Sequence, residues 1–319
     1  MKRKFVKWIG YLLIVGLLSG ALVFYFLVPI LMVEICHPKM GIVKDKQVKN
    51  YDLIASKIAG LPIEFYTKDS LLQSAYLTFS QTESTKGTII LVHGIRGSKE
   101  HFIGLSQWLA QNGYNAVLVD LRAHGQSEGR YCTFGVNEKI DLSLLIDKLI
   151  ALEDGNHNSI GSVGSIGSIG IWGQSLGAAV ALQTLSFDSR IKFGVIESTF
   201  SDFESISHDY LNYFMWYSHE SMSKFLVHRA GELGKFKTEL ASPVIACKSI
   251  HQPILMAHGD SDKKINIKYG KGNFKALASN HKEFITVEGA NHVSVWKTGG
   301  ERYFEKVLGF IDRHAIQEE

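Results

Sequence analysis

Short apolar runs alternate with longer amphipathic stretches along most of the chain after residue 60. The first two runs, residues 61–66 and 73–77, flank a polar turn and predict an antiparallel β-hairpin. The later runs are separated by stretches with helical periodicity, such as residues 100–111 and 136–152. Strands that alternate with helices predict an α/β fold, with a mainly parallel sheet covered on both faces. The later predicted strands are residues 88–92, 116–119, 169–172, 193–196, 253–257 and 283–287, and a last helix is predicted over 301–315.

The N-terminal stretch, residues 8–33, contains no charged residue. About 20 apolar residues cross a hydrocarbon core about 30 Å thick, so this stretch is long enough to span a membrane. A cleavable signal peptide is the competing interpretation, because residues 19–21 are all small. The apolar region of a signal peptide ends after about 7–15 residues, whereas this one continues to Val28 and beyond. We therefore predict an uncleaved, single-pass transmembrane anchor over residues 1–33, followed by a polar connector over 34–60.

Positive charges on both sides of this stretch bear on its orientation. The basic residues are Lys2, Arg3, Lys4 and Lys7 before it, and Lys39, Lys44, Lys46 and Lys49 after it. The first group is denser and nearer to the apolar stretch, so we predict that the N-terminus is cytoplasmic and the globular domain extracytoplasmic. Cys36 follows the stretch at a place where acylation is feasible, but residues 33–35 do not resemble a lipoprotein cleavage site.

The composition is that of a folded protein with modest charge. Among 319 residues, 45% are hydrophobic and 20% are charged, which excludes a disordered or collagen-like chain. The formal net charge is only +3, so we predict no nucleic-acid partner. The cysteines Cys36, Cys132 and Cys247 are far apart and odd in number, and they predict neither a disulfide framework nor a CxxC site.

Residues 173–177 have the sequence GQSLG, which matches the pattern G-x-S-x-G. They lie between the predicted strand 169–172 and an Ala-rich helical stretch, residues 178–185. A nucleophilic serine on a sharp strand-to-helix turn needs glycine on both sides, where a Cβ atom would clash with neighbouring backbone. The helix N-terminus also places a positive dipole where an oxyanion forms. We predict that Ser175 is a nucleophile, the alternative being a structural serine in a turn.

A general base and an orienting acid are expected after a nucleophilic serine of this type, in the chain order Ser, Asp or Glu, His. The loop after the strand 253–257 carries two aspartates. We predict Asp262 as the acid, because aspartates in loops usually bind backbone and Asp260 fits that role. The loop after the strand 283–287 leads to His292, which we predict as the general base.

Two backbone N–H groups are predicted to form an oxyanion hole beside Ser175. Leu176, directly after the nucleophile, supplies one of them. Ile95, in the glycine-containing loop after the strand 88–92, is predicted to supply the other.

Two neighbouring loops carry polar residues for which structural roles are predicted. His93 follows the strand 88–92 and is predicted to brace its loop instead of acting as a second base. Asp120 and Arg122 follow the strand 116–119 and are predicted to form an ion pair.

Five motifs together give the chain a resemblance to the α/β-hydrolase superfamily over about residues 61–316. The motifs are LVHGIRGSK at the predicted oxyanion loop, DLRAHGQSEG, GQSLGA at Ser175, HGDSDKKI at Asp262 and EGANH at His292. Within the superfamily the chain resembles membrane-anchored serine hydrolases of the esterase, lipase and peptidase types, with a short lid. The resemblance implies the α/β-hydrolase fold, with an eight-stranded, mainly parallel sheet in a domain over residues 61–319, and it implies no metal and no organic cofactor.

The lid implied by the resemblance is expected at about residues 200–250, and it includes the aromatic run 210–217. Such a run lines an apolar acyl pocket, meets a lipid interface, or packs the lid onto the sheet. Because an anchor holds the domain near lipids, we predict a small-molecule or lipid-like acyl substrate cleaved at a carboxylic ester or thioester. A peptidase or acyltransferase with the same three side chains is the alternative enzyme. A catalytically silent, membrane-tethered binding module is the alternative outside enzymes.

Overall fold

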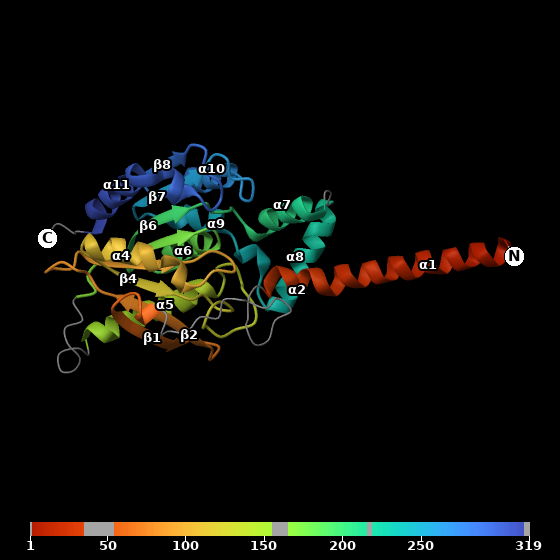
Figure 1. Ribbon diagram of the computed structural model, residues 1–319, viewed down its shortest axis with the longest axis horizontal. Helices are drawn as coiled ribbons and strands as arrows, with labels where there is room; N and C mark the ends of the chain where they lie inside the picture. Colours follow the sequence, from red (N-terminus) through yellow and green to blue (C-terminus); the bar gives the residue numbers. More distant parts are fainter. Residues whose placement is uncertain (1, 35–53, 155–164, 216–218, 316–319) are drawn as a thin grey trace.

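The computed structural model describes residues 2–34, 54–154, 165–215 and 219–315. Its centre is one eight-stranded sheet formed by β1 (Gly60–Tyr66), β2 (Leu72–Thr78), β3 (Gly87–Val92), β4 (Tyr114–Val119), β5 (Ile169–Gln174), β6 (Ile191–Glu197), β7 (Ile254–Gly259) and β8 (Lys282–Val287). The strand order is β1-β2-β4-β3-β5-β6-β7-β8 (Figure 1). β2 pairs antiparallel with β1 and β4, and the remaining neighbours are parallel.

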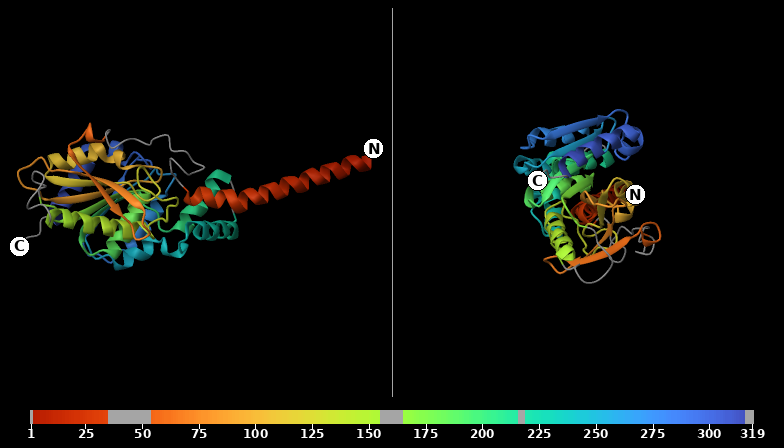
Figure 2. Two further views of the ribbon diagram at one scale, coloured as in Figure 1. Left: turned by 90° about the horizontal axis from the view of Figure 1, so that it is seen from below. Right: turned by 90° about the vertical axis from the view of Figure 1, so that its left-hand side faces the viewer.

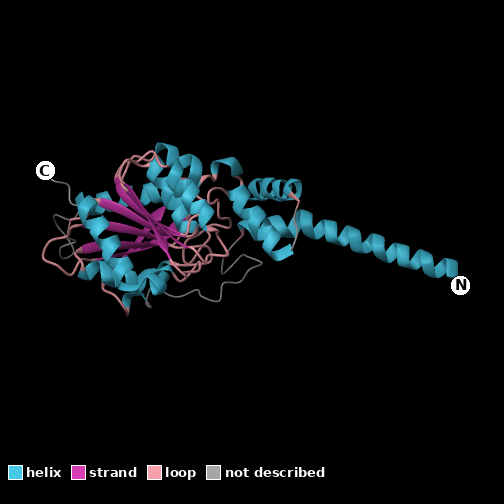
Figure 3. Ribbon diagram, turned by 90° about the horizontal axis from the view of Figure 1, so that it is seen from above, coloured by secondary structure: helices cyan, strands magenta, loops and turns pink. Residues whose placement is uncertain are grey.

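Helices cover both faces of the sheet (Figure 3). One face carries α4 (Ile103–Gln111) and α11 (Val295–Ala315), and the other carries α5 (Glu138–Asp154), α6 (Leu176–Phe187) and α10 (Ile267–Ala276). Alternate side chains of β3 point to opposite faces of the sheet. Ile90 and Val92 pack in the core with α5 and α6, whereas Ile89 and Leu91 pack with α4 and α11. Because both faces are covered, the central strands are buried at nearly every position and form continuous apolar runs.

A long N-terminal helix projects away from the sheet (Figures 1 and 2). It consists of α1 (Lys2–Leu22), the π-helical turn η1 (Val23–Leu27) and α2 (Val28–Val33). Pro29 accounts for the π turn, because proline has no N–H and its ring clashes with the carbonyl four residues earlier. The segment Lys7–Val33 is a 27-residue apolar helix, which is long enough to cross a membrane. A signal sequence can have the same length and apolar composition.

The chain between β6 and β7 forms a separate group of helices at the carboxyl end of the sheet. They are α7 (Phe203–Met215), α8 (Glu220–Gly234), η4 (Thr238–Leu240), α9 (Pro243–Ala246) and η5 (Cys247–Ser249). In Figure 1, α7 and α8 lie beyond the sheet on the side from which the N-terminal helix leaves, and α8 packs against α2. This group occupies the place where a lid is expected.

The predicted fold class is confirmed, and the hairpin and six later strands are all present within a few residues of the predicted bounds. The helix after Ser175 begins at once at Leu176, and the last helix begins at Val295, before the predicted start, with a break at Gly300, whose φ is 53°. Cys36 and most of the connector 34–60 lie outside the described residues.

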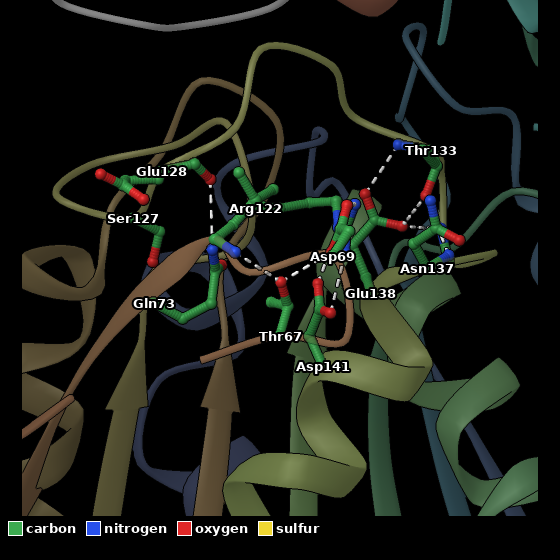
Figure 4. Close-up of polar contacts among 12 residues, drawn as sticks. Thr67, Asp69, Gln73, Arg122, Ser127, Glu128, Thr133, Asn137, Glu138 and Asp141 are labelled. Carbon is green, nitrogen blue, oxygen red and sulfur yellow. Dashed lines mark hydrogen bonds and ion pairs between the residues drawn. The ribbon is translucent and has the colours of Figure 1, made fainter. Parts of the chain in front are cut away.

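The predicted pairing of Asp120 with Arg122 is wrong. Asp120 instead accepts a hydrogen bond from the buried ammonium of Lys99 at 2.5 Å. The Arg122 guanidinium points elsewhere: it donates to both carboxylate oxygens of Asp141, at 2.7 and 2.8 Å, and contacts Asp69 at 3.2 Å (Figure 4). Arg122 therefore joins its loop to α5 and to the turn between β1 and β2, a bidentate role that suits guanidinium.

Candidate active site

Ser175 lies on the sharp turn between β5 and α6, with φ of 57° and ψ of −117°. Residues other than glycine rarely adopt these backbone angles, so the surrounding structure must hold Ser175 in this conformation. The flanking glycines allow the close contacts: a Cβ on Gly173 would lie 2.3 Å from the Gly177 carbonyl oxygen, and a Cβ on Gly177 would lie 1.9 Å from the Val92 carbonyl oxygen. The G-x-S-x-G spacing is thus a steric requirement of this turn.

The structure brings Ser175, Asp262 and His292 into one hydrogen-bonded chain. The loop after β8 places Nε2 of His292 2.9 Å from the Ser175 hydroxyl oxygen. On the other side of the ring, Nδ1 lies 2.7 Å from Oδ2 of Asp262, in the loop after β7. A neutral imidazole that donates from Nδ1 to the carboxylate leaves Nε2 free to accept the serine proton.

Asp262 is buried, and its environment favours the carboxylate over the carboxylic acid. Burial alone raises its pKa, but hydrogen bonds from His258, His292 and the Ile265 N–H outweigh burial and lower the pKa well below its usual range. The backbone N–H groups of Lys264 and Ile265 each donate to Oδ1 at 2.9 Å, which leaves Oδ2 for the imidazole. This geometry keeps a negative charge beside His292.

Asp260, the other aspartate of the loop after β7, binds backbone as predicted. Its Oδ1 accepts the Gly289 N–H at 2.8 Å. Asp260 therefore ties the loop after β7 to the loop that leads to His292.

The loop after β3 lies against Ser175. A Cβ on Gly94 would be 3.3 Å from the Ser175 Cβ, so Ile95 follows directly after the point of closest approach. Leu176 is the first residue of α6, where backbone N–H groups have no partner within the helix. Leu176 therefore adjoins the serine and Ile95 follows the glycine that lies against it, and the roles of both as oxyanion donors remain predictions.

His93 braces this loop, as predicted. Its Nε2 accepts the Leu121 N–H at 3.1 Å, and its Nδ1 donates to the Gly94 carbonyl at 2.8 Å. Complete burial, together with the neighbouring His124, lowers the pKa of His93 to about 3. His93 is therefore neutral near pH 7 and fixes the loop through two directed hydrogen bonds.

Comparison with known proteins agrees with the observed fold. The family described as "alpha/beta hydrolase fold" matches residues 87–241. The chain has the α/β-hydrolase fold. An uncharacterized Escherichia coli K12 protein, YfhR, is 24% identical over 255 residues, which cover 78% of this chain and 79% of YfhR. The Arabidopsis thaliana α/β hydrolase domain-containing protein WAV2 is 24% identical over 63% of this chain and 61% of its own length.

Among solved structures, the Pyrococcus furiosus esterase Pf2001 superposes with a TM-score of 0.66 at 23% identity, covering 85% of this chain and 98% of the esterase. An acylaminoacyl peptidase from Pyrococcus horikoshii superposes with a TM-score of 0.59 at 17% identity, covering 86% of this chain and 45% of the peptidase. At these identities the likeness is one of fold, and the same fold carries esterases and peptidases.

In this α/β-hydrolase fold, a second buried carboxylate near Ser175 was not found from the sequence. Glu197, at the end of β6, accepts hydrogen bonds from the indole N–H groups of Trp172 and Trp296, at 3.0 and 2.7 Å, and from the Tyr303 hydroxyl. The Gln174 amide donates to it at 3.2 Å. Because it has no cationic partner among these contacts, burial raises the pKa of Glu197 to about 7, although the four donors counteract the shift.

Glu197 joins the two elements that carry Ser175 and His292. Trp172 belongs to β5, which leads into Ser175, whereas Trp296 belongs to the first turn of α11, just after His292. The Glu197 carbonyl also accepts the Ser175 N–H at 2.9 Å. No local pattern marks Glu197 in the sequence, because its side-chain partners come from two distant segments, β5 and α11.

Two further residues lie near the site: His258, for which no role was predicted, and Tyr210, which belongs to the aromatic run 210–217 of the expected lid. His258 is buried, donates from Nε2 to the Ile265 carbonyl at 2.8 Å and lies 3.4 Å from Asp262. Tyr210, on α7, lies close enough to Asp262 and Arg96 for their charges to act on it: its pKa is raised by burial first and then by the Asp262 charge. α7 therefore reaches the catalytic edge of the sheet.

Within the part of the chain that the structure describes, no group of three or more His, Cys, Asp or Glu side chains is arranged to hold a metal ion. The sequence-based expectation of chemistry without metal or organic cofactor remains a prediction.

Proposed function

We propose that this chain is a membrane-anchored serine hydrolase that cleaves carboxylic esters or thioesters of acyl groups. The observation that carries the proposal is the continuous hydrogen-bonded chain from Asp262 through His292 to Ser175. A buried carboxylate, a neutral imidazole and a serine on a strained turn are what nucleophilic acyl transfer requires.

The proposed reaction has two halves. His292 removes the proton of Ser175 as its oxygen attacks the acyl carbonyl, while Asp262 stabilises the imidazolium that forms. The N–H groups of Leu176 and Ile95 hold the oxyanion, and His292 then gives its proton to the leaving alcohol or thiol. Water, activated by His292, releases the acyl group in the second half.

An ester or thioester substrate is proposed over an amide for two reasons. The esterase Pf2001 is similar in fold over nearly its whole length, whereas the peptidase match covers under half of the peptidase. The apolar helix Lys7–Val33 would also place the domain near acyl lipids. We further propose an anchor over 1–33, a connector over 34–60 and a hydrolase domain over 61–319 with a lid at about 200–250, on the extracytoplasmic side.

A fluorophosphonate probe tests the nucleophile. The detergent-solubilised full chain should be labelled, Ser175→Ala should not, and the control Ser186→Ala should be labelled like the wild type, because the Ser186 hydroxyl contacts Ser249 at the surface. Folded wild-type protein that resists labelling would favour the silent binding module.

A substrate panel tests the reaction class. p-Nitrophenyl esters and acyl thioesters should be hydrolysed faster than aminoacyl amides. The reverse order would favour a peptidase. Transfer of the acyl group to an added alcohol in preference to water would favour an acyltransferase.

A further inference from the structure

The last turns of the N-terminal helix are packed into the hydrolase domain. The Val33 side chain is fully buried in the main core, and its carbonyl accepts the Cys132 N–H at 2.9 Å. Glu34 follows, with its carboxylate buried and 3.3 Å from the Arg130 guanidinium. The helix therefore meets the domain in one fixed arrangement, because a backbone hydrogen bond, an ion pair and core packing hold its end.

Helix α8 contacts the same end of the N-terminal helix. The Tyr25 ring lies 6.1 Å from the Phe225 ring, centroid to centroid, and the Arg229 guanidinium lies 4.5 Å from the Tyr25 centroid. These are ordinary distances for aromatic and cation–π pairs. Since α8 also packs on α7, and α7 brings Tyr210 near Asp262, packed elements connect the N-terminal helix to the catalytic edge.

Length arithmetic places this contact at the membrane surface. The apolar helix Lys7–Val33 has 27 residues, and about 20 residues at 1.5 Å each cross a hydrocarbon core about 30 Å thick. If Lys7 marks one surface, the other surface falls at about the level of η1 and α2, where α8 is attached. Tyr25 then lies where tyrosine rings are enriched, at the boundary between lipid and water.

Apolar side chains continue from the helix onto the helices that follow β6. Phe26 on η1, Phe225 on α8 and Tyr213 near the end of α7 are all exposed, by 53%, 47% and 69%. Figure 1 and the left-hand view of Figure 2 place α7 and α8 beside the base of the N-terminal helix, on the side from which α1 leaves. Because Phe225 touches Tyr25, its exposed surface is continuous with that of the apolar helix.

We propose that η1, α8 and the end of α7 form a face that rests in the bilayer interface, so that the site takes its substrate from the membrane. The substrate class is a bilayer-resident amphiphile with a long acyl chain in ester or thioester linkage. The substrate part rests on the proposed hydrolase function. Continuity of the face with a helix of membrane-spanning length favours the bilayer as its occupant over a second copy of the chain or another protein.

Spin-label accessibility tests the position of the face without using catalysis. The full chain, with Cys36→Ser to remove a competing thiol, carries a nitroxide at Phe225→Cys and is reconstituted into phospholipid nanodiscs. The matched control is Phe187→Cys at the end of α6. The Phe187 side chain is 51% exposed and belongs to the helices that cover the sheet. We expect the label at position 225 to be more accessible to oxygen than to a polar nickel complex, and the label at 187 to show the reverse. Equal exposure of both labels to the nickel complex overturns the proposal, and so does a short distance between two labels at 225 in separate copies.

A pair of substrates tests the route of access. Phe225→Asp, away from the three proposed catalytic side chains, should leave hydrolysis of a water-soluble short-chain ester unchanged. It should lower hydrolysis of a long-chain ester embedded in the same nanodisc about ten-fold, the effect of losing one anchoring aromatic side chain. Phe187→Asp should change neither rate.

Loss of both activities in Phe225→Asp, or of neither, overturns the proposed route of access. If the wild type cleaves no ester of either kind, the hydrolase function fails and the substrate part of the proposal fails with it. The label result then stands alone as the test of the bilayer face, so the two failures remain distinguishable.

Discussion

Glu197→Gln should change how the stability of this protein depends on pH. Glu197 is fully buried among Trp172, Trp296 and Tyr303, and burial raises its pKa from 4.5 to about 7. A carboxyl group with a raised pKa in the folded state binds a proton more tightly there than in the unfolded chain. Stability from this group is therefore present below about pH 4.5 and is lost as the pH rises through about 7.

The size of the effect follows from the shift. Between the unfolded value of 4.5 and the folded value of about 7, each unit corresponds to about 1.4 kcal/mol, so the wild type should lose about 3 kcal/mol from this group. Glutamine does not titrate. Its amide NH₂ faces the donor groups of Gln174 and Trp296, which costs about 1–3 kcal/mol at every pH. Glu197→Gln should be less stable than the wild type in acid and should lose that disadvantage at higher pH.

Thermal unfolding of the detergent-solubilised full chain, followed by circular dichroism at about pH 5 and about pH 8, measures this difference. The Tm of Glu197→Gln minus that of the wild type should rise by about 6 °C or more between the two conditions. Glu64→Gln is the control, because the Glu64 side chain is exposed on β1 and its substitution should give a flat difference. A difference that stays flat for Glu197→Gln, or that falls with pH, refutes the reasoning, since it would mean that the carboxylate remains ionised throughout.

Three other substitutions test the geometry of the site and its supports. Asp262→Asn should lower kcat about 10⁴-fold without changing the circular dichroism spectrum, because an amide favours the wrong imidazole tautomer, and a loss under ten-fold would contradict the role of the acid. Gly177→Ala places a Cβ 1.9 Å from the Val92 carbonyl oxygen and should abolish fluorophosphonate labelling, so normal labelling would show that the turn tolerates a side chain. Asp141→Ala leaves the buried Arg122 guanidinium without its bidentate partner and should destabilise the protein by about 3–5 kcal/mol in thermal unfolding; an unchanged Tm would show that Arg122 finds another acceptor.

The sequence was most informative where local sterics or periodicity dictate structure. β3 is buried on both faces, so Ile89, Ile90 and Leu91 form an unbroken apolar run that predicts a central strand. The glycines around Ser175 are needed because β3 and α6 approach within contact distance, and this need is visible as a fixed spacing. The candidate residues Ser175, Asp262 and His292 could be chosen because each follows a recognisable strand.

Long-range polar partners could not be chosen in this way. The prediction for Asp120 and Arg122 relied on their closeness along the chain, yet their side chains leave the loop in different directions, toward Lys99 and Asp141. Glu197 was missed for the same reason. Opposite charges on residues that are close in sequence are weak evidence for a contact. The direction of each side chain depends on the local backbone, and other segments of the chain hold that backbone in place.

The two buried carboxylates beside Ser175 show how environment separates their roles. Asp262 receives two backbone N–H groups and faces two imidazoles, so its pKa falls and the carboxylate can stabilise a charged His292. Glu197 receives donors that are all uncharged, so burial prevails and its pKa rises toward 7. The uncharged donors around Glu197 thus let a buried carboxyl group join β5 to α11 without a cationic partner, whereas the hydrogen bonds to Asp262 keep a carboxylate next to the imidazole of His292.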